Sequence, residues 1–480
     1  MTSPVIFWFR QDLRLSDQAG LSAAQKTKVP ILPLYILDDE IAGNWKMGAA
    51  SRWWLHHSLK RHSEGLEKCG TQLILRRGPS IDVLLELIES TQAQGLYFSR
   101  GYQPHEVELE KKLSEILQEK GVECKRFSSA LLFEPEAIYN GSGERYKVFT
   151  PFWKACLRQE ALPQPLPKIK RLRGYKGHID SDPLESWGLL PTKPDWSGGM
   201  TETWTPGEKG AHQRLNDFVE NRMAEYGVNR DRPDTDGTSQ LSPYLHFGEI
   251  SPRQCWHAVK AYLAKEQRES CNGAEKFLSE LGWREFSYHL LFEWPDFPEK
   301  AFRPEFSDFP WDKKEQDLIA WQKGQTGYPI VDAGMRQLWH IGWMHNRVRM
   351  IVGSFLIKDL LISWQDGERW FWDTLVDADL ASNSAGWQWI AGSGADAAPY
   401  FRIFNPVRQS EKFDPDGDYI RTWVPELQNL EAKYIHAPWE APTAILQKAN
   451  VELGMTYPKP IVDHSLARNK ALEIFQSLKK

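Results

Sequence analysis

Near its start the chain reads Val5-Ile6-Phe7-Trp8-Phe9, followed directly by Arg10-Gln11-Asp12-Leu13-Arg14. Five consecutive apolar residues are typical of a short strand that is buried on both faces. The polar run after this strand contains no glycine-rich turn, so the usual dinucleotide-binding fingerprint is absent. This stretch predicts a buried strand in a domain that need not bind NAD or FAD.

Further apolar runs follow this strand, and stretches with helical patterning separate them. The expected strands are Val5–Phe9, Ile31–Leu37, Thr71–Leu75, Gly95–Phe98 and Val122–Phe127, and the expected helices include Ala50–Glu67, Ile81–Thr91 and His105–Lys120. Strands that alternate with helices predict a parallel sheet with helices on both faces. We therefore expect a doubly wound α/β domain over residues 1–130.

The rest of the chain has a different character. Residues 131–205 contain the proline-rich segment 162–167 and the basic run Lys168–Arg173, which are typical of an irregular linker between domains. Residues 206–480 show helical spacing of apolar residues almost throughout and no convincing strand alternation. We expect an all-helical second domain there.

Composition is that of an ordinary globular protein, with 41% hydrophobic and 26% charged residues. No apolar run approaches the ~18 residues of a membrane span, and the first residues do not resemble a signal peptide. The five cysteines are widely spaced, which favours reduced thiols in a cytoplasmic protein. Because the net charge is −5, a nucleic-acid partner would require a local basic face.

Tryptophan is the compositional outlier. The chain has 22 tryptophans, and twelve of them lie between Trp256 and Trp389. Because a buried indole N–H usually needs a hydrogen-bond partner, so many tryptophans in one segment suggest a role besides packing.

A cluster of hydroxyls, Thr238, Ser239 and Ser242, stands before Pro243 in the segment 237–252. Hydroxyl and backbone N–H donors at the start of a helix suit an anion such as a phosphate. The alternative is an ordinary helix cap, provided by Ser242 or Ser251.

A second candidate is Trp343-Met344-His345-Asn346-Arg347-Val348-Arg349-Met350. Asn346, Arg349 and Met350 lie at helical spacing and would share one face, which then offers an amide, a guanidinium and a thioether. Arg347 points elsewhere and could meet a phosphate. The alternative is an amphipathic helix with a pair of surface arginines.

The third candidate is Asp377-Ala378-Asp379-Leu380-Ala381-Ser382-Asn383-Ser384-Ala385-Gly386-Trp387-Gln388-Trp389. Its carboxylates and amide could hydrogen-bond a large heterocycle, and a carboxylate beside Arg349 would form a paired buried ion. The alternatives are a metal site and a solvated loop. We expect no metal, because no His or Cys lies nearby and a calcium loop would need more acids.

These motifs occur together with several other long motifs. They are Phe7-Trp8-Phe9-Arg10-Gln11-Asp12-Leu13-Arg14, Trp283-Arg284-Glu285-Phe286, Gly327-Tyr328-Pro329-Ile330-Val331-Asp332 and Asp396-Ala397-Ala398-Pro399-Tyr400-Phe401-Arg402-Ile403-Phe404-Asn405-Pro406. In this order they resemble the photolyase/cryptochrome family over nearly the whole chain. The resemblance implies light-driven repair of cyclobutane pyrimidine dimers in DNA by a deoxyribodipyrimidine photo-lyase. Excited FADH⁻ would donate an electron to the flipped dimer, and no general base would be needed.

The resemblance also implies which residues hold FAD in the helical domain. The residues that would grip its phosphates and ribitol are Tyr226, Thr238, Ser239, Gln240, Leu241 and Ser242. Arg349 would pair with Asp377 beside the isoalloxazine, Asp379 would contact its polar edge, and Asn383 would face its reactive ring nitrogen. A neutral amide there supports the anionic reduced flavin, whereas plant cryptochromes carry Asp.

Electron transfer and substrate binding follow from the same match. Trp387, Trp364 and Trp311 would conduct electrons between the flavin and the surface, although a single helical tryptophan is usually a core residue. Trp283 and Trp389 would stack on the flipped dimer, with Met350 as an apolar wall and with Glu280 and Asn346 as hydrogen-bonding partners. Arg230, Arg347 and Gln409 match positions that hold the DNA backbone or the rim of the pocket. The implied catalytic residues are Glu280, Asn383 and Met350.

Alternatives remain within the family. A (6-4) photolyase usually has His where Asn346 stands, and a cryptochrome photoreceptor often lacks a pocket tryptophan and carries a long tail. A generic flavin oxidoreductase would need a further substrate motif, and we find none. The segments 387–394 and 50–55 resemble the class III branch, and class I stays open. We expect a monomer.

The α/β domain of this family holds an antenna chromophore, most often the folate MTHF and next most often a deazaflavin. His105 and Glu106 match a folate-contacting pair in part, since His105 replaces the usual Asn. The identity of the antenna is therefore left open.

Overall fold

The first part of the chain forms a parallel sheet in the computed structural model, which describes residues 2–478. The strands are β1 (Val5–Phe9), β2 (Ile31–Leu37), β3 (Ile74–Arg77), β4 (Gly95–Ser99) and β5 (Glu123–Phe127), in the order β3-β2-β1-β4-β5. Val5 of the central strand lies opposite Ile31 on one side and Gly95 on the other. The predicted doubly wound α/β domain is confirmed.

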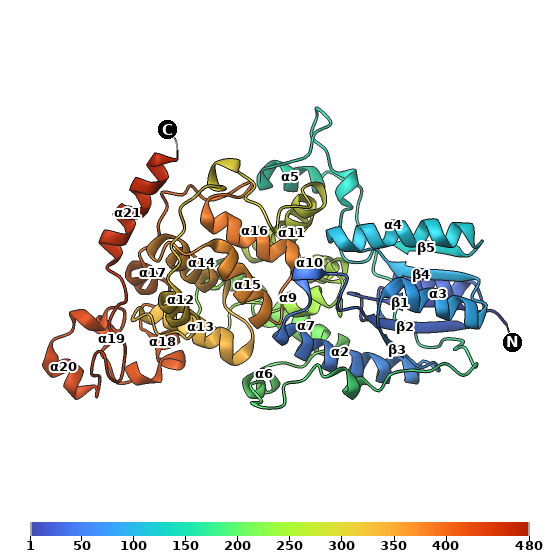
Figure 1. Ribbon diagram of the computed structural model, residues 1–480, viewed down its shortest axis with the longest axis horizontal. Helices are drawn as coiled ribbons and strands as arrows, with labels where there is room; N and C mark the ends of the chain where they lie inside the picture. Colours follow the sequence, from blue (N-terminus) through green and yellow to red (C-terminus); the bar gives the residue numbers. More distant parts are fainter. Residues whose placement is uncertain (1, 479–480) are drawn as a thin grey trace.

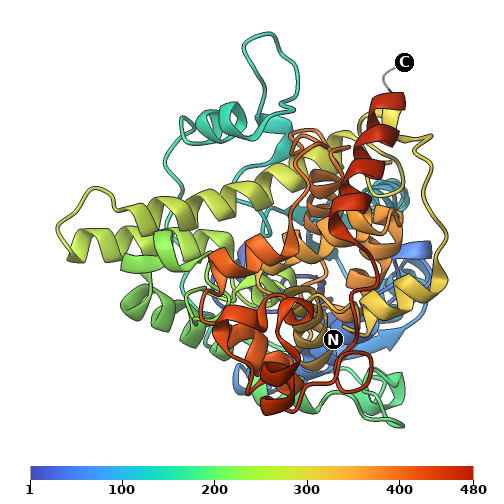
Figure 2. The same cartoon turned by 90° about the vertical axis from the view of Figure 1, so that its left-hand side faces the viewer.

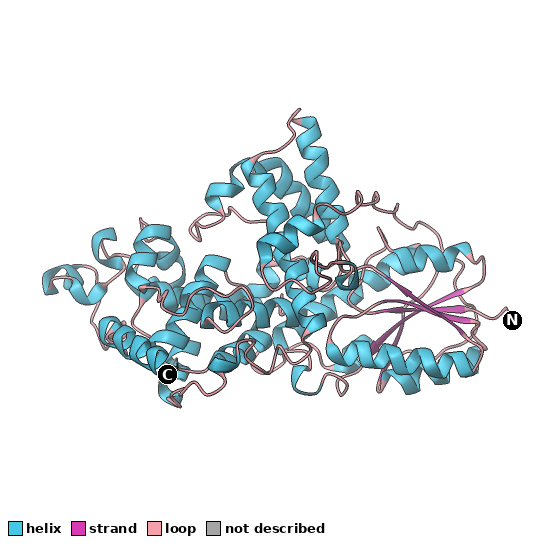
Figure 3. Cartoon of the chain, turned by 90° about the horizontal axis from the view of Figure 1, so that it is seen from above, coloured by secondary structure: helices cyan, strands magenta, loops and turns pink. Residues whose placement is uncertain are grey.

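Side chains of β1 alternate between two cores, as the pleat of a strand requires. Val5, Phe7 and Phe9 pack with α1 (Ala19–Lys26) and α2 (Ala49–Lys68). Ile6 and Trp8 pack with α3 (Ser80–Thr91) and α4 (Pro104–Glu119). Figure 3 shows helices on either side of the strands.

The linker region is more ordered than its composition suggests. It contains α5 (Phe149–Cys156), whose apolar face is buried, and the short α6 (Gly198–Thr203). Between these helices the chain returns to the sheet, where Tyr175 N donates to Ile31 O at 2.9 Å. The expectation of an irregular segment is therefore wrong for 149–156 and 198–203, and the linker wraps one domain against the other.

Helices make up the second part of the chain, as predicted. They are α7 (Glu208–Asn221), α8 (Tyr226–Asn229), α9 (Ser242–His246), α10 (Pro252–Lys265), α11 (Asn272–Glu293), α12 (Glu315–Gln322), α13 (Pro329–Ile341), α14 (Asn346–Ser354), α15 (Trp364–Thr374), α16 (Leu380–Ala391), α17 (Pro406–Phe413), α18 (Asp418–Trp423), α19 (Ala432–Ile435), α20 (Thr443–Lys448) and α21 (His464–Ser477). In Figure 1 this part lies to the left of the sheet, and Figure 2 shows the long helix α11 beside α10. None of the helices within residues 2–478 combines the length and apolar character needed to cross a membrane.

The polar run after β1 joins the two domains. Leu13 N donates to Phe247 O at 3.2 Å, and the buried Arg14 donates from Nη1 to Gly248 O at 2.9 Å. Gly248 has a φ of +64°, and a Cβ there would overlap the backbone of Gln11. This stretch therefore serves as the contact between the sheet and the helical domain.

Candidate cofactor and substrate cavity

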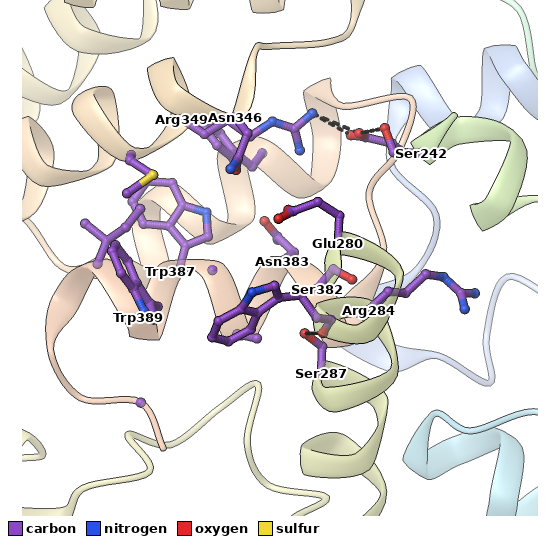
Figure 4. Close-up of a pocket in the computed structure, with 18 of the residues that line it drawn as sticks. Ser242, Glu280, Arg284, Ser287, Asn346, Arg349, Ser382, Asn383, Trp387 and Trp389 are labelled. Carbon is purple, nitrogen blue, oxygen red and sulfur yellow. Dashed lines mark hydrogen bonds and ion pairs between the residues drawn. The ribbon is translucent and has the colours of Figure 1, made fainter. Parts of the chain in front are cut away.

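A cavity of about 570 Å³ lies in the helical domain, among α11, α14 and α16. Figure 4 shows side chains from these helices around one shared space. The predicted residues that line it are Arg230, Ser242, Glu280, Trp283, Asn346, Arg347, Arg349, Met350, Asp377, Asn383, Trp387 and Trp389. The structure thus brings together most of the residues that the three motifs supplied.

Arg349 and Asp377 form an ion pair in the wall of this cavity. Arg349 Nη2 lies 2.8 Å from Asp377 Oδ2, and the same oxygen accepts a hydrogen bond from Ser242 Oγ at 2.5 Å. The Asp377 side chain is only 3% exposed, so the pair compensates a buried charge. Three segments that are distant in sequence therefore meet at one carboxylate.

Asn383 is held by its amide nitrogen. It lies in the first turns of α16, and its Nδ2 donates to the backbone oxygen of Glu368 at 3.0 Å. Its Oδ1 accepts no hydrogen bond from residues 2–478, and the residue lines the cavity. Asn383 therefore presents a hydrogen-bond acceptor to a ligand.

Asp379 is the N-cap residue of α16. Its Oδ1 accepts from Ser382 N at 2.9 Å and so caps α16, while its Oδ2 accepts from the Tyr288 hydroxyl. Burial raises the pKa of this carboxyl, but nearby His246 and Arg284 and the hydrogen bond from Tyr288 outweigh burial and hold the pKa well below its usual range. Asp379 is not among the cavity-lining residues, and its carboxylate is already bonded within the protein.

Trp283 and Trp389 supply flat apolar surface from two different helices. Trp283 comes from α11 and Trp389 from α16, and both are half-buried. Met350, on α14, lines the same cavity. Two indoles and a thioether can bind the faces of a planar ligand.

The cationic residues at this cavity are paired with acids. Arg230 Nη1 lies 2.6 Å from Glu280 Oε1, and Arg347 Nη2 lies 2.9 Å from Asp231 Oδ1. These carboxylates neutralise part of the basic face that the sequence suggested. Glu280 Oε2 accepts no hydrogen bond from residues 2–478 and stays available to a ligand.

The three proposed electron-transfer tryptophans share one hydrophobic cluster. Trp387 and Trp364 are each 2% exposed, and Trp311 is partly buried against the same cluster. Only Trp387 of the three lines the cavity. The Nε1 of Trp387 is buried and has no hydrogen-bond partner within residues 2–478. Of the three, Trp311 is therefore the most exposed.

Several predicted residues do not line the cavity. Tyr226 is buried against Phe218 and Phe277, and residues 238–241 form the irregular segment that leads into Ser242. Because α9 has only five residues, its start offers a weaker anion site than a long helix would. Gln409 lies on α17, outside the lining set.

His105 and Glu106 lie in the other domain, at the start of α4. Glu106 Oε1 accepts from Arg10 Nη2 at 2.7 Å, and its Oε2 accepts from the backbone of Tyr102 and Gln103. The Glu106 carboxylate therefore caps the start of α4 and pairs with Arg10, so both of its oxygens are bonded within the protein.

Sequence reasoning missed some lining residues. Arg284 donates from Nη1 to Ala130 O at 2.6 Å, and Trp343 Nε1 donates to Ser242 Oγ at 3.3 Å. Ser382 and Asp396 also line the cavity. All four stand inside motifs quoted above, so their segments were identified and only their individual positions were not.

The donor set fits FAD better than a metal. The cavity volume lies within the usual range for organic ligands, roughly 300–1,000 Å³. It combines aromatic walls, a free amide oxygen and an arginine–aspartate pair. Within residues 2–478, no group of three or more His, Cys, Asp or Glu side chains is arranged to hold a metal ion.

Comparison with known proteins agrees with this geometry. The family described as the FAD binding domain of DNA photolyase matches residues 277–477, and the family described as DNA photolyase matches residues 5–170. The deoxyribodipyrimidine photo-lyase of Agrobacterium fabrum is 50% identical over 479 residues, which is 100% of this chain and 99% of the relative. Cryptochrome-2 of Arabidopsis thaliana is 39% identical over 98% of this chain and 78% of its own length.

Solved structures give the same result. The crystal structure of a bacterial class III photolyase from Agrobacterium tumefaciens superposes with a TM-score of 0.96 at 50% identity. The match covers 100% of this chain and 98% of that chain. Both domains and their relative placement are therefore shared.

Proposed function

The chain belongs to the photolyase/cryptochrome family, and we propose that it repairs cyclobutane pyrimidine dimers in DNA under blue light. The observation that carries the proposal is one cavity with two kinds of wall. One wall is suited to hold a cofactor, and the other is suited to bind a substrate. Arg349, Asp377 and Asn383 form the first wall, and Trp283 and Trp389 belong to the second. One space of this composition allows an electron donor and a flipped lesion to meet.

Arg349, Asp377, Ser242 and Asn383 would hold FAD at the cavity. When bound in its reduced state, FAD would supply an electron to the dimer after absorbing light and take it back after the ring opens. Asn383 would accept a hydrogen bond at Oδ1, because its Nδ2 is already engaged with Glu368 O. A neutral amide at this position tolerates a reduced, anionic ring system.

Trp387, Trp364 and Trp311 would carry electrons between the surface and the cavity. Trp387 lines the cavity, and the other two belong to the same hydrophobic cluster without lining the cavity. The role of each residue rests on the family resemblance together with this arrangement.

Recognition of the dimer would rest on stacking and on two polar side chains. Trp283 and Trp389 would cover its faces, and Met350 would form an apolar wall. Glu280 Oε2 would accept a hydrogen bond from a ring N–H, and the Asn346 amide would bond the carbonyl and N–H groups. Arg230 Nη1 lies 2.6 Å from Glu280 Oε1, so this ion pair orients the carboxylate before the substrate arrives. Flipping the lesion out of the duplex costs a few kcal/mol, which these contacts would offset.

Arg230, Arg347 and Gln409 would hold the DNA backbone or the rim of the pocket. A bound phosphate would compete with Glu280 and Asp231 for the two guanidinium groups. The contacts would be local, because the chain as a whole carries a net charge of −5.

Within the family, the site favours repair of the cyclobutane lesion. Asn346 stands where (6-4) photolyases usually have His, and both pocket tryptophans are present. The 50% identity to the photo-lyase of Agrobacterium fabrum, against 39% to a plant cryptochrome, agrees with repair. The likeness to a class III photolyase over the whole chain supports assignment to class III.

An antenna chromophore, MTHF or a deazaflavin, would complete the light-harvesting apparatus. His105 and Glu106 are its proposed contacts, although Glu106 would first have to release Arg10 or the start of α4. An absorbance spectrum of the purified protein identifies the chromophore, because the folate and deazaflavin bands differ.

We propose a cytoplasmic monomer that acts on damaged DNA. The five cysteines are free, and three are buried, which suits a reducing compartment. Elution at the mass of one 55.5 kDa chain in size-exclusion chromatography is the expected result.

Complementation tests the function in cells. A photolyase-deficient bacterial strain that expresses the chain should survive ultraviolet irradiation better when blue light follows, and show no gain in the dark. No gain in light from protein that carries FAD would instead favour the photoreceptor alternative, and an equal gain in the dark would contradict light-driven repair.

A further inference from the structure

Phe149 is the first residue of α5, in the segment that connects the two domains. It is an aromatic residue with only 8% of its surface exposed, although α5 has just eight residues. The family match for the α/β part covers this position, and the match for the FAD-binding part begins only at residue 277. Phe149 is therefore contributed to the helical domain from outside it.

The ring of Phe149 lies flat against Trp283. The ring centroids are 3.8 Å apart and the planes differ by 9°. Trp283 lines the cavity and Phe149 does not, so Phe149 covers the indole from the side away from the cavity. Parallel aromatic rings at this separation resist rotation of either ring, because tilting the indole would drive its atoms into the neighbouring ring.

Two further contacts fix Phe149 itself. Its backbone N donates to Asp396 Oδ2 at 2.9 Å, and Asp396 lines the cavity. One turn along α5, Trp153 approaches α11 so closely that a Cβ at Gly282 would lie 2.7 Å from the indole. The start of α5 is therefore wedged between α11 and the loop after α16.

From this geometry we infer that Phe149 is a positioning residue, which sets the plane of Trp283 for stacking on the flipped dimer. The inference rests on the proposed repair function. Phe149 would not touch the lesion, and it would act through the indole that does. Removing its flat face leaves Trp283 free to tilt, so the pocket loses part of its preorganised stacking surface.

The test compares Phe149→Leu with Phe149→Tyr in the FAD-loaded, full-length protein. Leucine keeps an apolar side chain but removes the flat ring, and tyrosine restores the ring. Phe152→Leu is the matched control, since Phe152 is buried in the same helix and packs on Phe286 instead of Trp283. Bound FAD, read from its absorbance, reports whether each variant is folded.

The readouts are the Kd for an oligonucleotide with one thymine dimer, the Kd for undamaged DNA and the repair rate at saturating substrate. For Phe149→Leu we expect a roughly two- to tenfold rise in the first Kd, the range that a lost aromatic pair supplies. The other two quantities and the photoreduction rate should stay at wild-type values. Phe149→Tyr should restore tight binding, and Phe152→Leu should bind as the wild type does.

An unchanged dimer Kd in Phe149→Leu, or an equal loss in Phe152→Leu, would overturn the inference. If Phe149→Leu fails to retain FAD, Phe149→Met gives the same comparison with a flexible side chain. The loss should also shrink when Trp283 is already changed to leucine, and full additivity would contradict coupling through the indole. Failure of the wild type to repair dimers would refute the proposed function instead, so the two failures are distinguishable.

Discussion

At Asn383 one amide is oriented by a backbone carbonyl. Its Nδ2 is engaged with Glu368 O at 3.0 Å, which leaves Oδ1 as the group offered to the cavity. Trp389, which lies further along α16, supplies an aromatic surface to the same cavity. Two residues of one helix would therefore contact different partners, Asn383 the cofactor and Trp389 the dimer. Substitutions should separate the two roles.

Trp389→Ala should weaken dimer binding and slow repair, and it should leave FAD bound. Stacking of a base on an aromatic ring contributes about 1–3 kcal/mol, so the dimer Kd should rise by about ten- to a hundredfold. Binding titrations with a dimer-containing oligonucleotide and the absorbance of bound FAD check the two parts. Trp372→Ala provides a control, since Trp372 is buried but does not line the cavity. Repair at the wild-type rate in Trp389→Ala would refute the assignment.

Trp387→Phe should slow photoreduction of the bound flavin by at least about tenfold, because phenylalanine is far harder to oxidise than tryptophan and each ~1.4 kcal/mol of added barrier costs a factor of ten. Trp387 is the member of the proposed chain that lines the cavity. The measurement is the flavin absorbance under blue light with an external reductant. Trp372→Phe should behave as the wild type does. An unchanged rate in Trp387→Phe would exclude this residue from the path.

Glu368→Gln should change how stability depends on pH. Burial raises the pKa of Glu368 from 4.5 to about 8. Between these two values the unfolded chain loses its proton while the folded chain keeps it, so this group makes the free energy of unfolding fall as pH rises. Glutamine mimics the protonated acid and removes that fall, by up to about 1.4 kcal/mol per pH unit.

Denaturation of the FAD-loaded protein at several pH values checks this prediction. The stability of Glu368→Gln relative to the wild type should rise between pH 4.5 and about 8. Glu119→Gln, a change of an exposed glutamate on α4, should run parallel to the wild type. Parallel curves for Glu368→Gln would show that the buried acid is ionised in the folded state.

The site residues that the sequence identified are those that stand in contiguous motifs. Arg349, Asp377 and Asn383 are recognisable because their neighbours along the chain form long, distinctive segments. The pairing of Arg230 with Glu280 and the stacking of Phe149 on Trp283 join segments far apart in sequence. Such contacts depend on the tertiary packing of helices, which no local pattern encodes.

At the scale of elements, α15 and α16 pack through a glycine. Gly367 of α15 faces the ring of Trp387 on α16, and a Cβ at this position would overlap that ring. The close approach also explains how a large indole can be 2% exposed between two helices. The packing of these helices therefore determines where the first tryptophan of the chain lies.

Gly367→Ala should displace Trp387 and destabilise the protein by roughly 1–3 kcal/mol, as overpacking of a core does. Photoreduction should slow at the same time, because the indole can no longer keep its place in the cavity wall. Thermal unfolding and flavin photoreduction measure the two effects. Gly386→Ala on α16 is the control, since a Cβ there meets no atom within 4 Å. If Gly367→Ala unfolds at the same temperature and its flavin is photoreduced at the same rate as in the wild type, the close contact is absent.

The predicted helices and strands agree with the structure where the apolar pattern in the sequence is long and clear. The strands β1 and β2 have the predicted bounds, and α2 differs by one residue at each end. β3 begins at Ile74 instead of Thr71, because Thr71 N is bonded to Leu66 O in the turn that ends α2. The eight-residue α1 was not predicted, since it offers too few apolar positions for a periodicity to show.

At the scale of the whole molecule, the α/β domain and the helical domain act as one unit. The run after β1 and the connecting segment both contact the helical domain, through Arg14 and Gly248 and through Phe149 and Trp283. Residues before the helical domain, which we expect to begin at residue 206, therefore help the residues within it to support the cavity. This packing of two domains into one unit is consistent with a light-driven reaction that needs both an antenna and a cofactor.

The most direct test of the account is repair of a defined lesion in vitro. Purified protein with reduced FAD is mixed with an oligonucleotide that carries one thymine dimer, and the loss of the dimer is followed under blue light and in the dark. The account predicts restoration of the two thymines in light only, with a rate that falls in Trp389→Ala. Intact dimers after illumination of protein that carries reduced FAD would contradict it.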